Sequence, residues 1–334
     1  MKNLITDIAG LRIGNAHDTK LASGVTALIF DEPAVASIAI HGGAPGGRDT
    51  ALLEPDMTVG KVDALVLSGG SAFGLDSMGG VQAHLREIGR GFAIGDMRVP
   101  IVPGAILFDL LNGGDKNWTH KPPYWDLGYE AARNASPDFK LGTVGAGYGA
   151  TTVNLKGGLG SVSAKTTNGF TVGAIVAVNA IGSAIIGDGP HFWATHYERE
   201  SEYGGLGSPG TFSADALKLI AKGGASPRNE NTTIAIVATD AALDKGQAKR
   251  LAVMAHDGMG RALRPSHAAF DGDTVFAAAT GAKGAPSMGE LLEIGTLAAD
   301  CLARAIARGV YEATALPFPG ALPDWRTTFG ASLR

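Results

Sequence analysis

Two threonines stand where a polar stretch of the chain runs into an apolar one. Asn231, Thr232 and Thr233 precede the apolar run Ile234–Ala238 in the sequence NENTTIAIVATDAAL. Threonine is common at strand starts, where its hydroxyl satisfies loose backbone groups, so a structural role is the simplest interpretation. A chemical interpretation also exists. If the chain were cut before Thr232, that residue would carry a hydroxyl nucleophile and a free amine able to act as its general base.

Two carboxylates offer a partner for such an amine. Asp271 and Asp273 flank a glycine in FDGDTVFAAAT, directly before another apolar run. An Asp-Gly turn is enough to explain this pair by itself. Beside a new amine, however, a carboxylate could fix both the position and the charge state of the nitrogen.

A glycine-rich turn could bring backbone amides to a ligand. In LSGGSAFGLD, the residues Gly69, Gly70 and Ser71 follow an apolar run and precede a possible helix. The segment lacks the lipase-type GxSxG pattern. Its amides could stabilise an oxyanion, or the turn could simply be a tight corner between a strand and a helix, and the sequence leaves both interpretations open.

The segment GAGYGA, residues 145–150, fits the letters of a dinucleotide-binding fingerprint and contains Gly147 and Tyr148. A nucleotide site of that kind also needs an acidic residue about 20 positions further on. The following segment SAKTTNGFTVG offers none. A tight loop whose amides face a ligand or a neighbouring strand is therefore the better interpretation.

The histidines and the cysteine predict neither a metal nor a cofactor. None of the eight histidines forms an HExxH pair, and none lies with carboxylates at ligand spacing. His191 and His196, five residues apart, are assigned structural roles. Cys301 is the single cysteine, which excludes an internal disulfide and a cysteine metal cluster, and its helical apolar surroundings indicate packing.

Composition excludes several classes of function. The 334 residues are 45% hydrophobic and 18% charged, enough to bury a large core. The net charge of -4, from 28 basic and 32 acidic residues, gives no basic surface for nucleic acid or an anionic membrane. The start MKNLITDIAGLRIG has no secretory pattern, and no run of 18 apolar residues occurs. Together with the single cysteine, these features predict a soluble cytoplasmic protein.

Strands and helices must position these residues. Glycine makes up 49 of the 334 residues, which suggests many short strands joined by tight loops. Apolar runs of strand length alternate irregularly with helical patterns, without the regular βαβ order of a doubly wound fold. The predicted strands are Val25–Phe30, Val62–Leu67, Val172–Ala180, Ile234–Ala238 and Val275–Ala279, and the predicted helices cover residues 74–88, 243–258 and 288–313.

Two further segments complete this organisation. VGAIVAVNAIGSAIIG, residues 172–187, is expected to form an antiparallel hairpin because a glycine joins two apolar halves. Residues 189–231 are polar and rich in Gly, Pro and Ser, so much of this stretch is expected to be a long surface loop. The pattern predicts sheets with helices packed on their outer faces.

Eight segments, in order, resemble the P1 family of self-cleaving N-terminal-nucleophile hydrolases, which includes the L-aminopeptidase/D-esterase, the β-aminopeptidases and the endo-type nylon oligomer hydrolase. The resemblance covers nearly the whole chain. Its segments are ITDIAGLRIGNA, GGAPGGRDTALLEP, VLSGGSAFGLD, VGAGYGATT, KGGLGS, VGAIVAVNAIG, NTTIAIVATDAAL and FDGDTVFAAAT. It implies an α+β fold, a four-layer αββα sandwich of the L-aminopeptidase/ornithine acetyltransferase type. It also implies one self-processing domain, residues 1–334, cut at Asn231-Thr232 into an α chain, 1–231, and a β chain, 232–334, that stay together.

The resemblance also implies a role for each site residue. Thr232 would be the nucleophile, Asn179 would bind the oxyanion or orient the nucleophile, and Asp271 with Asp273 would surround the new amine. The loops that contact the substrate and the oxyanion would be formed by Gly69, Gly70, Ser71, Phe73, Gly147 and Tyr148.

This chain departs from the nylon-hydrolase branch at two of these positions. Phe73 stands where that branch has a tyrosine, which removes a hydroxyl from the site. Asn154 stands where the branch has a lysine that contacts the nucleophile. The nearest lysine here is Lys156, two residues further on, and it is the candidate replacement.

The function implied is hydrolysis of peptide or small amide bonds through an acyl-Thr232 ester, with an aminopeptidase or amidase as the first choice. Endo-hydrolysis of linear ω-amino-acid oligomers is the alternative within the family. An acyltransferase like ornithine acetyltransferase is a second alternative, although its Met-Ala-Thr-Met-Leu junction is replaced here by Glu-Asn-Thr-Thr-Ile. An unprocessed binding protein is a third. The resemblance further implies a homo-oligomer, a tetramer of αβ units, acting on small-molecule or peptide amides.

Overall fold

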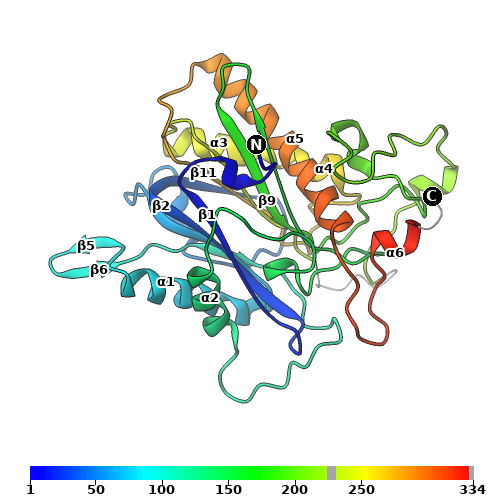
Figure 1. Ribbon diagram of the computed structural model, residues 1–334, viewed down its shortest axis with the longest axis horizontal. Helices are drawn as coiled ribbons and strands as arrows, with labels where there is room; N and C mark the ends of the chain where they lie inside the picture. The colour runs from blue at the N-terminus through cyan, green and yellow to red at the C-terminus, as the bar shows by residue number, and fades with distance from the viewer. Residues whose placement is uncertain (224–230, 331–334) are drawn as a thin grey trace.

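Nine hydrogen-bonded strands form a mixed sheet at the centre of this computed structural model, which describes residues 1–223 and 231–330 (Figure 1). The strands follow the order β3-β7-β4-β2-β11-β10-β9-β8, and β1 pairs with β2 beside this path. The pairs β10/β11 and β4/β7 are parallel. The strands are β1 Leu11–Asp18, β2 Ser23–Ile40, β3 Gly47–Arg48, β4 Val62–Ser68, β7 Gly104–Ile106, β8 Leu159–Lys165, β9 Thr171–Ala177, β10 Ile234–Thr239 and β11 Thr274–Ala279. A two-stranded hairpin, β5 Phe92–Ile94 and β6 Met97–Val99, projects to one side (Figure 1).

The long strand β2 joins the two halves of the sheet. Its first part pairs with β1 and β4, and its second part, from Val35 to Ile40, pairs with β11. The sequence predicted only Val25–Phe30 as a strand, because Asp31, Glu32 and Pro33 interrupt the apolar run. Those three residues are exposed and lie within the strand, at a shift in its register with β4.

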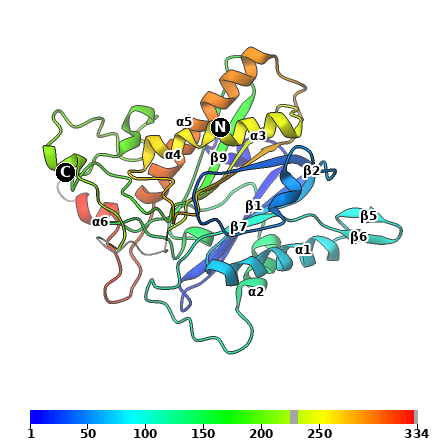
Figure 2. The same cartoon turned by 180° about the vertical axis from the view of Figure 1, so that it is seen from behind.

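Helices flank the sheet on both sides (Figures 1 and 2). One side is covered by α1 and α2, and the other by α3, α4 and α5. The helices are α1 Ser77–Glu87, α2 Tyr124–Arg133, α3 Lys245–Ala255, α4 Asp257–Ala262, α5 Met288–Tyr311 and α6 Trp325–Phe329. Among the described residues, none of these helices combines the length and the apolar character needed to cross a membrane.

Successive side chains of a central strand pack into two different hydrophobic clusters. On β10, Ile234 and Ile236 face a cluster that also contains Phe30 of β2 and Leu65 of β4, whereas Val237 faces the cluster under α3 and α5. Successive side chains of a strand point to opposite faces, so β10 is buried on both. The α+β prediction, with helices outside the strands, is confirmed.

Glycines allow helices to approach the strands closely. A Cβ added to Gly14 of β1 would lie 1.7 Å from the carbonyl oxygen of Ala131 in α2, and one added to Gly160 of β8 would lie 1.8 Å from that of Ala305 in α5. No side chain fits in these spaces. The glycine content therefore serves the packing of helices on strands as well as the tight turns that the sequence predicted.

The predicted hairpin within residues 172–187 is wrong. β9 ends at Ala177, and the hairpin is made by β8 and β9 through residues 166–170. After β9 the chain leaves the ladder at Asn179, whose amide bonds to two loops rather than to a returning strand.

The helical predictions hold with shifted ends. Residues 71–76 form a 3-10 turn before α1, and the predicted helix over 243–258 divides at His256 into α3 and α4. The described part of the predicted loop 189–231 contains only two short 3-10 turns, Trp193–Tyr197 and Ala214–Leu217. Residues 224–230 of that loop lie outside the described residues.

Candidate active site

Thr232 lies buried at the head of β10, with its hydroxyl against the preceding residue. Its exposed fraction is 5%, and that of Asn231 is 2%. The Thr232 Oγ1 donates to the carbonyl oxygen of Asn231, and the backbone N–H of Gly272 donates to the same oxygen at 3.3 Å. The N–H of Thr232 donates to the carbonyl of Asn179 at 3.0 Å. The carbonyl oxygen of the Asn231-Thr232 peptide bond therefore accepts from both a hydroxyl and a backbone amide.

Parallel pairing of β10 with β11 brings the acidic pair to this point. Both strands begin at the same edge, and a bridge between Asn231 and Asp271 extends the ladder beyond them. The N–H of Thr233 donates to Oδ1 of Asp273 at 2.9 Å. A Cβ on Gly272 would lie only 2.4 Å from the Thr232 Oγ1, so glycine between the two acids leaves the space that this hydroxyl occupies.

The pKa values of the two carboxyl groups are shifted in opposite directions. Burial, then the charge of Asp273, raises the pKa of Asp271 to about 8. Burial also acts to raise the pKa of Asp273, but hydrogen bonds from His267 and from the N–H of Thr233 outweigh it and lower the pKa. The His267 Nδ1 and its backbone N–H each lie 2.9 Å from Asp273 Oδ2. These opposite shifts favour the proton on Asp271 and the negative charge on Asp273.

Asp271→Asn is expected to flatten the dependence of the unfolding free energy on pH. The folded-state pKa of about 8 lies above the 3.8 of a free carboxyl, so the folded chain keeps a proton that the unfolded chain loses. Stability from this group is complete below pH 3.8 and is lost as the pH rises to about 8, and an amide has no such slope. Urea denaturation of the Thr232→Ala protein at pH 5 and pH 8, with and without Asp271→Asn, measures how the unfolding free energy changes with pH. Equal slopes with and without the Asp271→Asn change would contradict the assignment, and exposed Asp56→Asn is the control.

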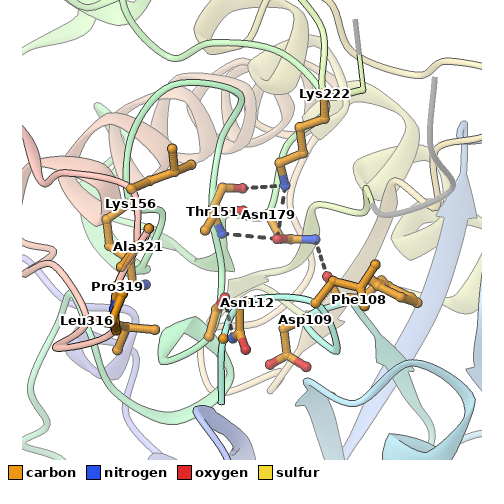
Figure 3. Close-up of a pocket in the computed structure, with 15 residues that line it drawn as sticks. Phe108, Asp109, Asn112, Thr151, Lys156, Asn179, Lys222, Leu316, Pro319 and Ala321 are labelled. Atoms are coloured by element: carbon orange, nitrogen blue, oxygen red, sulfur yellow. Dashed lines mark hydrogen bonds between the residues drawn. The ribbon is translucent and has the colours of Figure 1, made fainter. Parts of the chain in front are cut away.

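A cavity of about 250 Å³ opens beside Asn179 (Figure 3). Thr232 is not among the described residues that line it, but its N–H bonds to the backbone of Asn179, which is. Asn179 therefore links Thr232 to the cavity. The lining consists of Phe108, Asp109, Leu111, Asn112, Gly113, Gly149, Thr151, Lys156, Asn179, Lys222, Leu316, Pro319, Gly320, Ala321 and Leu322.

The amide of Asn179 is held by three separate segments (Figure 3). Its Oδ1 accepts from the N–H of Thr151 at 3.0 Å and from Nζ of Lys222 at 3.2 Å, and its Nδ2 donates to the carbonyl of Phe108 at 3.0 Å. The Lys222 Nζ also donates to the carbonyl of Thr151 at 2.8 Å. These bonds fix the amide plane at the cavity wall.

Sequence reasoning missed Lys222 and Asp109. Lys222 lies in a polar loop with no periodic pattern, and only the fold brings it to Asn179. Burial raises the pKa of Asp109, whose carboxylate accepts from the hydroxyl of Ser23 at 2.6 Å and from the N–H of Gly70 at 2.8 Å. The residues around Asp109 in the sequence gave no separate signal.

Lys156 reaches the cavity, whereas Asn154 bonds elsewhere. The Lys156 Nζ donates to the carbonyls of Gly147, Ala150 and Gly157 at 2.7–3.0 Å, and burial lowers the pKa of this amine to about 7. Asn154 Oδ1 accepts from the hydroxyls of Thr152 and Ser183. Among the described lysines, Lys222 rather than Lys156 donates to Asn179.

The Gly69–Ser71 turn and Phe73 are not among the described residues that line the cavity. Gly70 and Ser71 have left-handed φ angles of 87° and 52°, and the N–H of Gly70 is already engaged by Asp109. This geometry supports a strand-to-helix corner that holds Asp109. Phe73 is 47% exposed, and its ring lies edge-on to Trp118.

Two residues of the other glycine-rich loop, Gly147 and Tyr148, contact side chains that line the cavity. The carbonyl of Gly147 accepts from Lys156, and Tyr148 stacks on His17 and packs against Leu316, a lining residue. Both residues therefore act on the cavity through side chains that line it.

Comparison with known proteins gives one consistent result. Residues 3–320 match the family model described as peptidase family S58. The chain is 40% identical over 346 residues to an uncharacterized aminopeptidase of Mycobacterium bovis, covering 98% of each chain. It is 24% identical to the 6-aminohexanoate-oligomer endohydrolase of a Kocuria species, covering 82% of this chain and 74% of the relative. The structure of the L-aminopeptidase D-Ala-esterase/amidase from Ochrobactrum anthropi superposes with a TM-score of 0.67 at 19% identity, covering 99% of this chain and 94% of that one.

Proposed function

Because this chain belongs to peptidase family S58, whose members are hydrolases, we propose that it is an aminopeptidase or amidase that cuts itself before Thr232. The cut would leave an α chain, 1–231, and a β chain, 232–334, whose new terminal residue is the nucleophile. The observation that carries the proposal is the placement of the Thr232 hydroxyl and the Gly272 N–H on the same carbonyl, that of Asn231.

Self-cleavage would follow from this geometry. The Thr232 Oγ1 attacks the carbonyl carbon of Asn231, and the negative charge that forms on the oxygen faces the N–H of Gly272. Collapse breaks the C–N bond, the hydroxyl proton passes to the leaving nitrogen, and an ester joins the two parts. Water then hydrolyses the ester, giving a carboxylate on Asn231 and a free amine on Thr232.

In the mature enzyme the same residues would act on a substrate. The amine of Thr232 takes the proton of its own hydroxyl as that oxygen attacks the amide carbonyl, and later gives a proton to the leaving amine. Asp271 and Asp273 position this amine. Asn179 and backbone amides hold the oxyanion, each donor contributing about 3 kcal/mol to lowering the barrier. Water then hydrolyses the acyl-Thr232 ester.

The cavity supports cleavage of a short substrate end. Its volume of about 250 Å³ lies below the roughly 300–1,000 Å³ of drug-sized sites. Asp109 supplies the carboxylate among the described lining residues, and an aminopeptidase needs a carboxylate for the ammonium group of its substrate. Lys222 at the same wall adds a positive charge, which favours carbonyl or carboxylate groups of the substrate.

A matched pair of substrates tests this assignment. An aminoacyl p-nitroanilide with a free amine is expected to be cleaved with a kcat/KM about 100-fold above that of its N-acetylated form, because only the ammonium group pairs with Asp109. Asp109→Asn should remove most of this difference, with the melting temperature measured to verify folding. Mid-chain cleavage of a capped 6-aminohexanoate oligomer, with no activity on the free-amine substrate, would support the endo-hydrolase instead. Transfer to an added amine without hydrolysis would support an acyltransferase.

The layering and assembly belong to this proposal as well. The three core clusters support a four-layer αββα arrangement, with one cluster between the two groups of strands and one under each group of helices. The projecting β5–β6 hairpin exposes Phe92, Ile94, Met97 and Val99, which supports assembly into a homo-oligomer such as a tetramer of αβ units. Light scattering of the purified protein measures the number of units.

A further inference from the structure

Three histidines from distant parts of the chain converge beside the acidic pair. His41 follows β2 and is exposed, His256 lies buried between α3 and α4, and His267 lies half-buried before β11. One ring nitrogen of each lies within 4.8 Å of one from each of the others. The sequence argument compared only spacing along the chain, so it could not detect a cluster formed by distant segments.

His267 is oriented as a metal-binding histidine would be. Its backbone has a φ of 58°, unusual for a residue other than glycine, and both its N–H and its Nδ1 bond to Asp273 Oδ2. The nitrogen left for a cation is Nε2. Histidine ligands in proteins commonly present one nitrogen to the metal while a carboxylate holds the other.

His256 shows the same division of roles. Its Nε2 lies 2.9 Å from the carbonyl oxygen of Ala39 and donates to it, which leaves the lone pair on Nδ1. The side chain is 1% exposed, and Nδ1 has no hydrogen-bond partner among the described residues. A buried nitrogen without a partner requires an explanation, and a bound cation supplies one.

We propose that His41, His256 and His267 bind one divalent transition-metal ion of the zinc class. Nitrogen donors favour zinc, copper and nickel over magnesium or calcium. Zinc–nitrogen bonds of about 2.0–2.1 Å place ligand nitrogens about 3.3 Å apart, so the rings must close by about 1.5 Å. His41 is exposed, which gives the ion an entry path and one ring that can move.

The surrounding charges favour a cation. Asp273 and Asp257 both act electrostatically on His41, and Lys249 opposes them. His267 also acts on His41 as a positive charge, but as a neutral metal ligand it would leave two carboxylates facing one ammonium group around the cluster. The rings are already close, since those of His41 and His256 stack with centroids 3.8 Å apart and that of His267 stands edge-on to both. Because an imidazole lone pair lies in the plane of its ring, the exposed His41 must turn out of this stack to share an ion with His256.

The three histidines also come from both sides of the bond that the proposed self-cleavage would break. His41 belongs to residues 1–231, whereas His256 and His267 belong to residues 232–334. If the proposed cleavage occurs, the ion would tie the α chain to the β chain. The binding itself does not depend on cleavage, so it can be measured in an uncut protein.

The experiment titrates metal-stripped, untagged Thr232→Ala protein with Zn²⁺ in competition with a chromophoric chelator. One ion per chain is expected, and His41→Ala or His256→Gln should weaken binding by at least the roughly 10- to 100-fold that loss of a supporting group costs. Exposed His120→Ala is the matched control and should bind like the parent. Co²⁺ should give the strong visible absorption of a four-coordinate site made by three nitrogens and one water, and Zn²⁺ at 100 times Kd should raise the melting temperature by about 4 °C.

Two outcomes would overturn the proposal. One is the absence of stoichiometric binding by the folded protein. The other is binding of equal affinity in the His41→Ala and His256→Gln variants, because the ion would then lie elsewhere. Neither outcome depends on self-cleavage, since the protein tested has no nucleophile at position 232.

Discussion

Thr232→Ala is expected to remain a single chain under denaturing conditions, whereas the wild type separates into fragments ending at Asn231 and beginning at Thr232. The alanine has no oxygen to attack the Asn231 carbonyl, which the hydroxyl contacts directly. Amide hydrolysis should fall by about 10⁶-fold in kcat, because the nucleophile and its free amine disappear together. Intact-mass analysis and a p-nitroanilide assay measure the two effects.

Thr233→Val is the matched control for this experiment. Valine keeps the branched shape and the backbone N–H that Asp273 binds, and it removes a hydroxyl that has no hydrogen-bond partner among the described residues. Cleavage at the wild-type position is therefore expected in this variant. A wild-type chain that stays uncut on long incubation would contradict the proposed mechanism and favour an unprocessed binding protein.

Gly272→Ala is expected to block or slow self-cleavage by about 100-fold or more while the chain still folds. The new Cβ would lie 2.4 Å from Thr232 Oγ1 and 2.9 Å from its Cγ2, so the threonine must move away from the Asn231 carbonyl. The same shift would displace the Gly272 N–H, and loss of one oxyanion donor alone costs about 10²- to 10³-fold. The measurement is the rate of fragment appearance in freshly purified protein.

Gly289→Ala is the control for adding a methyl group. Gly289 lies in the first turn of α5, and a Cβ there meets no atom within 4 Å. This variant should cleave at the wild-type rate and gain up to about 1 kcal/mol of stability, since alanine favours a helix over glycine. If Gly272→Ala also cleaves at the wild-type rate, the N–H of Gly272 and the space beside it have no part in the reaction.

Local patterns were enough to predict the strands and helices that carry the candidate site residues. The apolar run after the Thr232 junction became β10, which is buried in the core, and the regular spacing over 288–313 became α5. These elements are specified by neighbours in the sequence. The exposed residues Asp31 and Glu32 ended the predicted strand too early. In the structure, β2 continues through them because its second part pairs with β11.

The parts of the site that sequence could not predict depend on contacts between distant segments. Lys222 bonds to Asn179 from a loop without a pattern, and Asp109 is fixed by Ser23, which stands 86 residues away in the chain. The ring of His256 stacks on that of His41 for the same reason, and its Nε2 bonds to a carbonyl 217 positions away. Such contacts follow from the order of strands in the sheet, which spacing does not encode.

The pairing of β10 with β9 and of β11 with β2 means that unfolding of the proposed mature protein would separate two chains. Both pairs join residues from before position 232 to residues after it, so a cut chain would hold its sheet together only through noncovalent bonds. Melting of the precursor releases one polymer, whereas melting of the mature form releases two. The melting temperature of the mature form should therefore rise more steeply with protein concentration than that of the uncut Thr232→Ala chain, which shares the same assembly surface.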